Sequence, residues 1–240
     1  MTAQQDTLRF TFERYCDMIE GLQEAGRSFV GYDDEMESGD VLLRHDVDWS
    51  PANAERMAQL EANRGVSSTY FFLLTSPFYN LSYEANREAV STILELGHDI
   101  GLHFSTHQYW SAEPDREELE SAVQTERTVL STLFDEEIST VSFHIPPEWV
   151  LRRSFDPFQS TYEERYFSDI AYRGDSNQRW RSDPPFADGI PEKVQILAHP
   201  GLWNDTDQLF EERLDAERRN HFADVSSFLE YQFVDDAVAR

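Results

Sequence analysis

Two histidines, His103 and His107, stand four residues apart, directly after a short apolar run. If the chain enters a helical turn after Leu102, both imidazoles lie on one face of that turn and can bind a single metal ion. Two ligands do not complete such a site. A third ligand must therefore come from another part of the chain.

Two carboxylates in an earlier segment can supply that ligand. Asp46 and Asp48 follow the apolar run 41–43, and in an extended chain their i, i+2 spacing places both side chains on one side of the strand. One carboxylate can bind the metal while the other stays free as a base. A divalent ion held in this way keeps open coordination positions, polarises an acyl oxygen and lowers the pKa of a bound water. The two segments together predict a hydrolytic metal centre.

The rest of the chain alternates between predicted strands and predicted helices. We expect strands over 28–32, 41–47, 67–74, 99–102, 139–143 and 194–198, and helices over 11–25, 51–63, 83–96, 114–134, 206–222 and 225–239. The stretch 152–185 has no clear period and is interpreted as short elements and loops. Alternation without an internal repeat predicts a parallel α/β sheet or barrel.

Five candidate side chains share one position in this arrangement. Each lies at or just beyond the C-terminal end of a predicted strand: Asp46, Asp48, His103, His144 and His199. In parallel α/β barrels this edge of the sheet is where active sites are built. A lone histidine is more often a core or capping residue, but the shared position of five groups favours catalysis. Asp46 can take a proton from water while His199 gives one to a departing amine.

The order of these motifs over 41–203 resembles the polysaccharide deacetylase superfamily, the group around carbohydrate esterase family 4 with its NodB-homology domain. The resemblance implies one domain over 1–240, folded as a distorted (β/α) barrel of seven parallel strands, with helical additions at both ends. It also implies a metal-dependent hydrolase that removes an N-linked acetyl or formyl group from a sugar. The implied cofactor is one divalent metal ion, Zn2+ before Co2+, Ni2+ or Fe2+.

The resemblance also implies a role for each motif. Asp46 is the general base, His199 is the general acid, and the metal ligands are Asp48, His103 and His107. The roles of supporting these groups or of binding the substrate fall to Arg44, His144, Asp175, Trp180 and Trp203. In the loosely matched fourth motif, Asp175 orients His199, and Asp169 is a rival for that role.

The third motif departs from the family pattern, which is Arg-x-Pro-Tyr. This chain has the sequence His-Ile-Pro-Pro at 144–147, so the family's arginine, which holds the base carboxylate, is missing. The candidates for its task are His144, Arg44, Arg173 and Arg181. Pro147 also has no backbone N–H to offer to an oxyanion. This departure leaves the rate and the substrate class open.

Three other functions fit parts of the pattern. Non-haem iron oxygenases use two histidines and a carboxylate, but on an antiparallel scaffold that the strand-helix alternation argues against. A hydrolase of a non-sugar amide or C–N bond would use the same site. A catalytically impaired, metal-containing carbohydrate-binding relative would keep the metal and lack efficient chemistry.

The charge of the chain limits its partners. There are 46 acidic and 20 basic residues, a net charge of −26, and Lys193 is the only lysine. Nucleic acid and anionic membranes repel such a surface, and the loss of lysine with acid excess favours adaptation to a salty cytoplasm. Cys16 has no partner for a disulfide, and neither a signal peptide nor an apolar run of about 18 residues is found. We therefore expect a cytoplasmic protein that does not insert into a membrane. Its expected substrate is a small-molecule, nucleotide-linked or lipid-linked sugar precursor. The sequence leaves its oligomeric state open.

Overall fold

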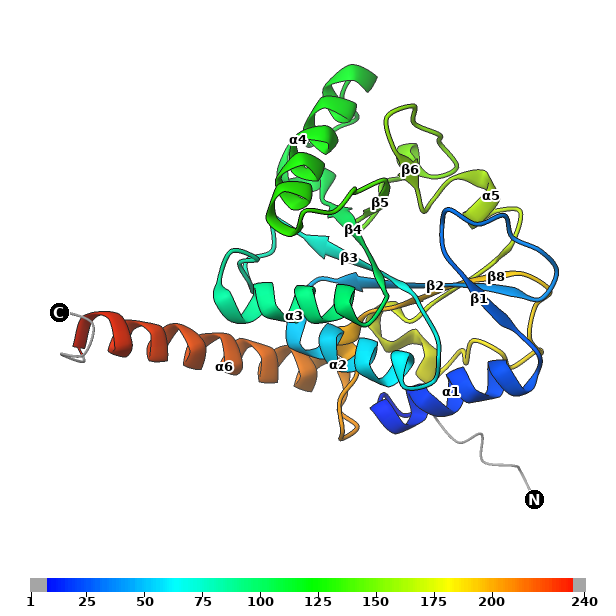
Figure 1. The fold of residues 1–240 in the computed structure, drawn as a ribbon, viewed down its shortest axis with the longest axis horizontal. Coiled ribbons are helices and arrows are strands. Elements are labelled where there is room, and N and C mark those ends of the chain that lie inside the picture. The colour runs from blue at the N-terminus through cyan, green and yellow to red at the C-terminus, as the bar shows by residue number, and fades with distance from the viewer. Residues whose placement is uncertain (1–7, 235–240) are drawn as a thin grey trace. The chain divides into compact units, whose positions relative to one another are not determined.

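The computed structural model describes residues 8–234, and a curled parallel sheet forms its centre (Figure 1). The strands are β1 (Ser28–Val30), β2 (Asp40–Val47), β3 (Thr69–Leu73), β4 (Asp99–Phe104), β5 (Thr140–Phe143), β6 (Gln159–Ser160), β7 (Ala171–Gly174) and β8 (Val194–Ala198). Seven of them follow the order β6-β5-β4-β3-β2-β8-β7, and β1 pairs with the start of β2. Every pairing is parallel, and within residues 8–234 none joins β6 to β7. The predicted distorted (β/α) barrel is confirmed as an open half-barrel.

Six α-helices accompany the strands in the described part of the chain. They are α1 (Phe12–Glu24), α2 (Pro51–Ala62), α3 (Glu84–Glu95), α4 (Arg116–Phe134), α5 (Glu164–Phe167) and α6 (Phe210–Leu229). The hydroxyls of Thr11 and Ser50 cap α1 and α2 by accepting backbone N–H groups, and Pro51 occupies the first turn of α2. Helices α1, α2 and α3 lie side by side below the sheet in Figure 1, and α4 lies beside β4.

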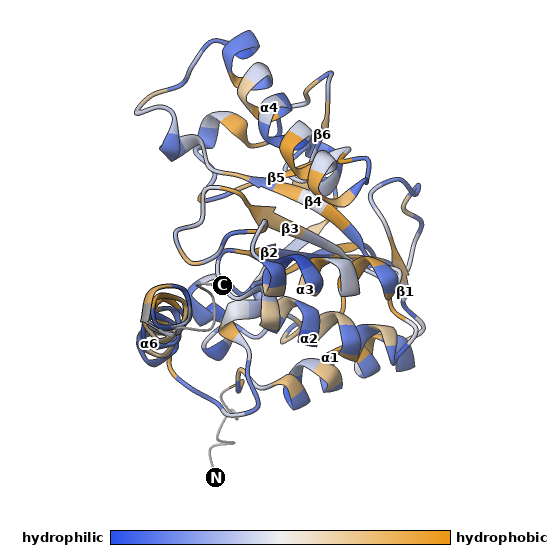
Figure 2. Cartoon of the chain, turned by 60° about the vertical axis from the view of Figure 1, so that its left-hand side comes forward, coloured by the Kyte–Doolittle hydropathy of each residue, from blue (hydrophilic) through white to orange (hydrophobic). Residues whose placement is uncertain are grey.

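The central strands are buried on both faces, which explains their continuous apolar runs. All eight residues of β2 and all five of β3 are buried, and Figure 2 shows the hydrophobic colour gathered on β3, β4 and β5. Alternation along β2 separates two polar sets. Arg44 and Asp46 face the interior of the half-barrel, whereas His45 faces the helices and bonds to Glu61 of α2 at 2.7 Å.

Glu61 is the centre of a fully buried polar cluster between the sheet and the helices. Its carboxylate accepts hydrogen bonds from Ser68 at 2.6 Å, from Tyr70 at 3.0 Å and from Tyr15. Burial alone would raise the pKa of Glu61, but the neighbouring His45 lowers it. The cluster satisfies a buried charge and fixes the helices against β2 and β3, so we give it a structural role.

The stretch 152–185 is confirmed as short elements and loops. It contains β6, α5, β7 and a 3-10 segment, Ser176–Arg181, which are too short to give a detectable period. The structure differs from the predicted elements near the C-terminus. The predicted break between 222 and 225 is wrong, because α6 runs through it and continues as a π-helical segment, Glu230–Val234. The remainder of the helix expected up to Ala239 lies outside the described residues.

The chain divides into two compact units, Met1–Asp207 and Gln208–Arg240. The whole sheet and helices α1 to α5 belong to the first unit, and α6 belongs to the second. Across residues 8–234, no helix is both long enough and apolar enough to span a bilayer.

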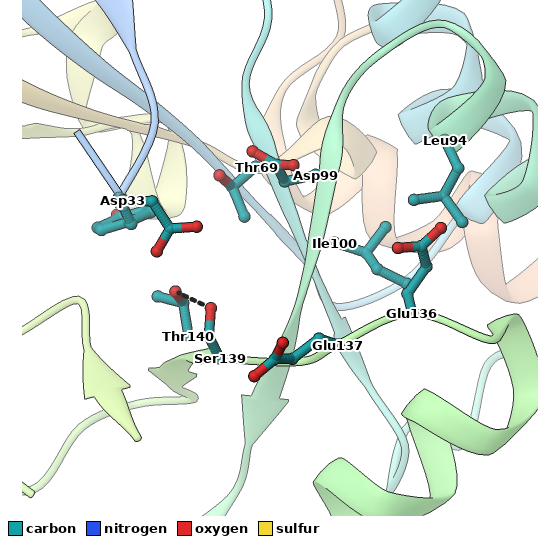
Figure 3. Close-up of a pocket in the computed structure, with 10 residues that line it drawn as sticks. Asp33, Thr69, Leu94, Asp99, Ile100, Glu136, Glu137, Ser139 and Thr140 are labelled. Atoms are coloured by element: carbon teal, nitrogen blue, oxygen red, sulfur yellow. Dashed lines mark hydrogen bonds between the residues drawn. The ribbon is translucent and has the colours of Figure 1, made fainter. Parts of the chain in front are cut away.

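An acidic pocket lies at the N-terminal ends of β3, β4 and β5 (Figure 3). Its carboxylates come from Asp33, Asp99, Glu136 and Glu137. Burial and the nearby charge of Asp33 raise the pKa of Asp99. These groups repel one another, and they lie at the opposite edge of the sheet from the five candidate side chains.

Candidate active site

Three potential metal ligands converge at the C-terminal edge of the sheet. Asp48 follows β2, His103 is in β4, and His144 follows β5. Asp48 Oδ1 lies 3.1 Å from His103 Nε2 and 3.0 Å from His144 Nδ1, and the two nitrogens are 3.1 Å apart. Ligands around a tetrahedral Zn2+ are about 3.3 to 3.6 Å apart. The three atoms are therefore a few tenths of an ångström from the spacing that one ion requires.

The hydrogen bonds of Ser142 favour the tautomer of His103 that suits a metal ligand. The Ser142 hydroxyl donates its one hydrogen to Asp46 Oδ2 at 3.0 Å, because a carboxylate oxygen can only accept. It accepts from Arg44 at 2.8 Å, and it can also accept from His103 Nδ1 at 3.0 Å. With the proton on Nδ1, the lone pair of His103 Nε2 faces the other two ligand atoms. This donor set fits a divalent ion such as Zn2+.

His107 is not a member of this group. His103 is still in the extended strand β4, and the following 3-10 turn (η1) covers only Thr106–Gln108, so the helical turn expected after Leu102 is absent. The expectation that the two histidines share a helical face is therefore wrong. His107 is exposed, and its Nε2 lies 2.9 Å from the carbonyl oxygen of Ile145.

Asp46 is held by Arg44, two residues earlier on the same strand. Arg44 Nε and Nη2 donate to the two carboxylate oxygens at 3.0 and 2.8 Å, and Arg44 is fully buried. The guanidinium also donates to Thr161 and to the Tyr162 hydroxyl. Burial alone would raise the pKa of Asp46, but the charge of Arg44 lowers it to about 2. Asp46 is therefore a carboxylate at neutral pH, as a general base requires.

His199 has the opposite protonation state. Its Nδ1 lies 2.6 Å from Asp175, which is fully buried and also accepts from the His199 backbone N–H at 3.1 Å. Burial alone would lower the pKa of His199, but the Asp175 carboxylate raises it to about 9. His199 Nε2 is 4.0 Å from Asp48 Oδ2, so this proton donor is at the edge of the ligand group.

The two tryptophans lie behind this pair. Trp203 donates its indole N–H to Asp175 at 2.9 Å, and its ring is 6.0 Å from that of Trp180. Both side chains are only 1% exposed, so they lie in the interior and present no surface to a substrate. Asp175 thus has the geometry to orient His199, and within residues 8–234 the rival Asp169 makes no hydrogen bond or ion pair with that ring.

The sequence interpretation missed the side chains of Ser142, Thr161 and Tyr162, which accept hydrogen bonds from Arg44. Ser142 is two residues before His144 on a strand, and this alternation was a signal that its side chain shares the inward face. Thr161 and Tyr162 follow β6 in the stretch without a clear period. Nothing in their local pattern indicated contact with Arg44.

No family model matches the sequence, and no curated protein matches it. Several solved structures resemble the fold. One is a CE4 family pseudoenzyme from Bacillus anthracis, with 13% identity, coverage of 82% of this chain and 65% of that chain, and a TM-score of 0.45. Another is the CE4 domain of a multidomain xylanase from the hindgut metagenome of Trinervitermes trinervoides, with 12% identity, coverage of 78% of this chain and 82% of that chain, and a TM-score of 0.47. A third is a peptidoglycan deacetylase from Bacillus subtilis, with 12% identity, coverage of 80% of this chain and 96% of that chain, and a TM-score of 0.46.

The chain thus spans about two thirds of the length of that pseudoenzyme. The structural neighbours are CE4 family proteins, as the motif resemblance suggested, but identity to them is low. What this site can do is therefore derived below from its own side chains.

Proposed function

We propose that this protein is a metal-dependent hydrolase that removes an N-linked acyl group, acetyl or formyl, from a sugar or glycan precursor. One observation carries the proposal. A carboxylate kept ionised by Arg44 lies 3.8 Å from His103, and an imidazolium kept protonated by Asp175 lies 4.0 Å from Asp48, two of the three proposed metal ligands. Amide hydrolysis needs this combination of a base, an acid and a site for a developing negative charge.

In this proposal Asp48, His103 and His144 hold the metal, with His144 in place of the expected His107. A divalent ion held there, Zn2+ by the character of its ligands, would supply polarisation of the acyl oxygen and a lower pKa for a bound water. No other part of the reaction is assigned to the metal.

The remaining steps belong to the chain. Asp46 accepts the proton of the attacking water, and Arg44 holds its two oxygens in place during the transfer. His199 donates its Nε2 proton to the nitrogen of the departing amine when the C–N bond breaks. Asp175 keeps the donor protonated and oriented through Nδ1. The products are a free amine on the sugar and a carboxylate.

The substrate class is supported by two features. The motif resemblance and the neighbours named as deacetylases favour N-acyl sugars. Pro147 cannot donate a backbone hydrogen bond to the oxyanion, and one missing donor costs roughly 100-fold to 1,000-fold in rate. A dedicated nucleotide-linked or lipid-linked precursor can offset this loss through its remote groups, whereas a simple chitin fragment cannot.

Release of acetate or formate tests the proposal. Metal-loaded protein in high salt is incubated with polymeric, lipid-linked and nucleotide-linked N-acyl sugars. We expect slow release from chitin oligomers and faster release from at least one precursor. Absence of release from every sugar would contradict the proposal and favour the second candidate, an impaired metal-containing carbohydrate-binding relative, which the proline at 147 makes the natural alternative.

A further inference from the structure

His107 makes a hydrogen bond that ties two sheet-edge turns together. Its Nε2 is 2.9 Å from the carbonyl oxygen of Ile145. A carbonyl can only accept, so Nε2 carries the hydrogen and donates it. The bond joins the turn after β4 to the residue that directly follows His144, one of the three proposed ligands.

Ile145 has a backbone conformation that its side chain disfavours. Its φ is +45°, in the left-handed region that β-branched residues rarely enter. Such strain persists only where the surroundings hold the backbone in place. The Ile145 side chain is 68% exposed, so its own packing cannot supply that restraint. Contacts to the backbone must supply it.

The turn cannot close through its own backbone. A β-turn is closed by a hydrogen bond from the backbone N–H of residue i+3 to the carbonyl of residue i. For turns that begin at Phe143 and at His144, residue i+3 is Pro146 and Pro147, respectively. Proline has no N–H. No backbone N–H of Pro146 or Pro147 can therefore close the turn, and the imidazole of His107 supplies a hydrogen bond from outside it, to the carbonyl of Ile145.

His144 is thereby fixed from both sides. On its N-terminal side, its backbone N–H donates to the carbonyl of Phe104 at 2.9 Å. On its C-terminal side, Ile145 is in the left-handed conformation and its carbonyl accepts the bond from His107. Between these two restraints, His144 Nδ1 is directed at Asp48 and His103.

We propose that His107 is a positioning residue, a latch that holds the strained turn at Ile145 so that His144 presents Nδ1 to the metal. This inference rests on the metal centre of the proposed function. It gives His107 a role distinct from that of a ligand. Hydrogen-bonding partners one step removed from a metal commonly change its affinity by about 10-fold to 100-fold.

The test compares substitutions that separate donating a hydrogen bond from ligating a metal. His107→Phe keeps a ring but cannot donate, whereas His107→Gln can donate through its amide. Zn2+ affinity is measured by competition with a chelator on the full chain in high salt, and the visible spectrum of the Co2+-loaded protein reports the ligand geometry. We expect His107→Phe to bind one equivalent about 10-fold to 100-fold more weakly, and His107→Gln to bind within a few-fold of the natural protein.

A third substitution tests the strain directly. Glycine adopts positive φ without cost, so Ile145→Gly makes the latch unnecessary. In the Ile145→Gly background, His107→Phe should weaken Zn2+ binding less than about threefold, a coupling that a double-mutant cycle measures. An unrelated structural role of His107 would give the same loss in both backgrounds.

Several results would overturn the inference. Unchanged affinity in His107→Phe means that no latch exists. Metal loss in both His107 variants as complete as in His103→Ala means that His107 is itself a ligand. If the natural protein binds no metal, the metal centre and the latch both fail. If metal binds with the expected ranking but no acyl group is released from any sugar, the proposed function fails and the latch stands.

Discussion

At the scale of single residues, the site is defined by two groups held in opposite protonation states. Asp46 is ionised because Arg44 outweighs the effect of its burial, and His199 is protonated because Asp175 does the same for an imidazole. A base and an acid separated in this way are a recurrent feature of hydrolytic sites. Both residues are outside the group of three ligand atoms.

Removing either proton-transfer group should therefore spare the metal. We expect Asp46→Asn and His199→Ala to retain about one equivalent and to lose roughly 100-fold or more in kcat. Elemental analysis and turnover on the best precursor measure the two quantities. Loss of metal from either variant would show that the roles are divided wrongly.

The pH dependence of turnover should respond to Asp175. His199 acts as an acid only while protonated, and Asp175 raises its pKa, so activity is present at lower pH and is lost as pH rises through that pKa. Asp175→Asn removes the charge and lowers the pKa of His199. The alkaline limb of the kcat/KM profile should then move to lower pH. Asp169→Asn is the matched control and should leave the limb in place; an unmoved limb in Asp175→Asn would contradict the role of His199.

At the scale of elements, the site depends on how closely β4 packs in the half-barrel. Gly101 is two residues before His103 on this strand. A Cβ built at Gly101 would lie 2.3 Å from Phe71 Cε1 and 3.0 Å from the carbonyl oxygen of Thr140. Phe71 is fully buried and has no free space to move into. Only glycine allows β4 to approach β3 and β5 this closely.

Gly101→Ala should consequently destabilise the fold by about 1 to 3 kcal/mol through overpacking. Denaturant unfolding in high salt measures this free energy. Gly21→Ala is the control, because a Cβ at Gly21 meets nothing within 4 Å and lies inside α1. That change should be neutral or should stabilise by about 0.5 to 1 kcal/mol. Equal effects of the two substitutions would contradict the packing described here.

The buried central strands were the part of the structure that the sequence predicted best. The run 41–47 became β2 and 194–198 became β8, because buried parallel strands have continuous apolar sequences. The position of the site followed, since parallel strands bring their C-terminal ends to one edge. The short strands β6 and β7 could not be predicted, because their pairing is decided by neighbours distant in the chain.

The third proposed ligand was missed for a local reason. The spacing of His103 and His107 suggested a helical face, but β4 extends through His103, and His144 follows β5 on the same inward face as Ser142. No sequence pattern announces the positive φ of Ile145, the residue after it. Arg44 was only one of four candidates to hold Asp46, because the choice depended on contacts from β5 and from the residues after β6.

At the scale of the whole molecule, charge dominates the behaviour. A net charge of −26 raises the electrostatic free energy of the compact state. Acidic groups also meet locally, as in the pocket of Figure 3, where the pKa of Asp99 is raised. Screening extends over roughly 10 Å at 0.1 M salt and roughly 3 Å at 1 M. Salt should therefore stabilise the fold.

The melting temperature should fall when molar KCl is diluted to 0.1 M. Asp99→Asn should recover part of this loss at low salt and have less effect at high salt, because it removes one of the repelling charges. Asp17→Asn is the matched control, since Asp17 pairs with Arg14 at 3.3 Å and its loss relieves no repulsion. Calorimetry measures all three proteins. A melting temperature independent of salt would contradict adaptation to a salty cytoplasm.

The central claim is that Asp48, His103 and His144 bind one divalent metal ion. The most direct measurement is an anomalous difference map, recorded at the zinc absorption edge from crystals grown with Zn2+. We predict one peak about 2.0 to 2.2 Å from Asp48 Oδ1, His103 Nε2 and His144 Nδ1, with His107 still bonded to Ile145. A peak ligated by His107 in place of His144, or no peak at this edge of the sheet, would contradict the account.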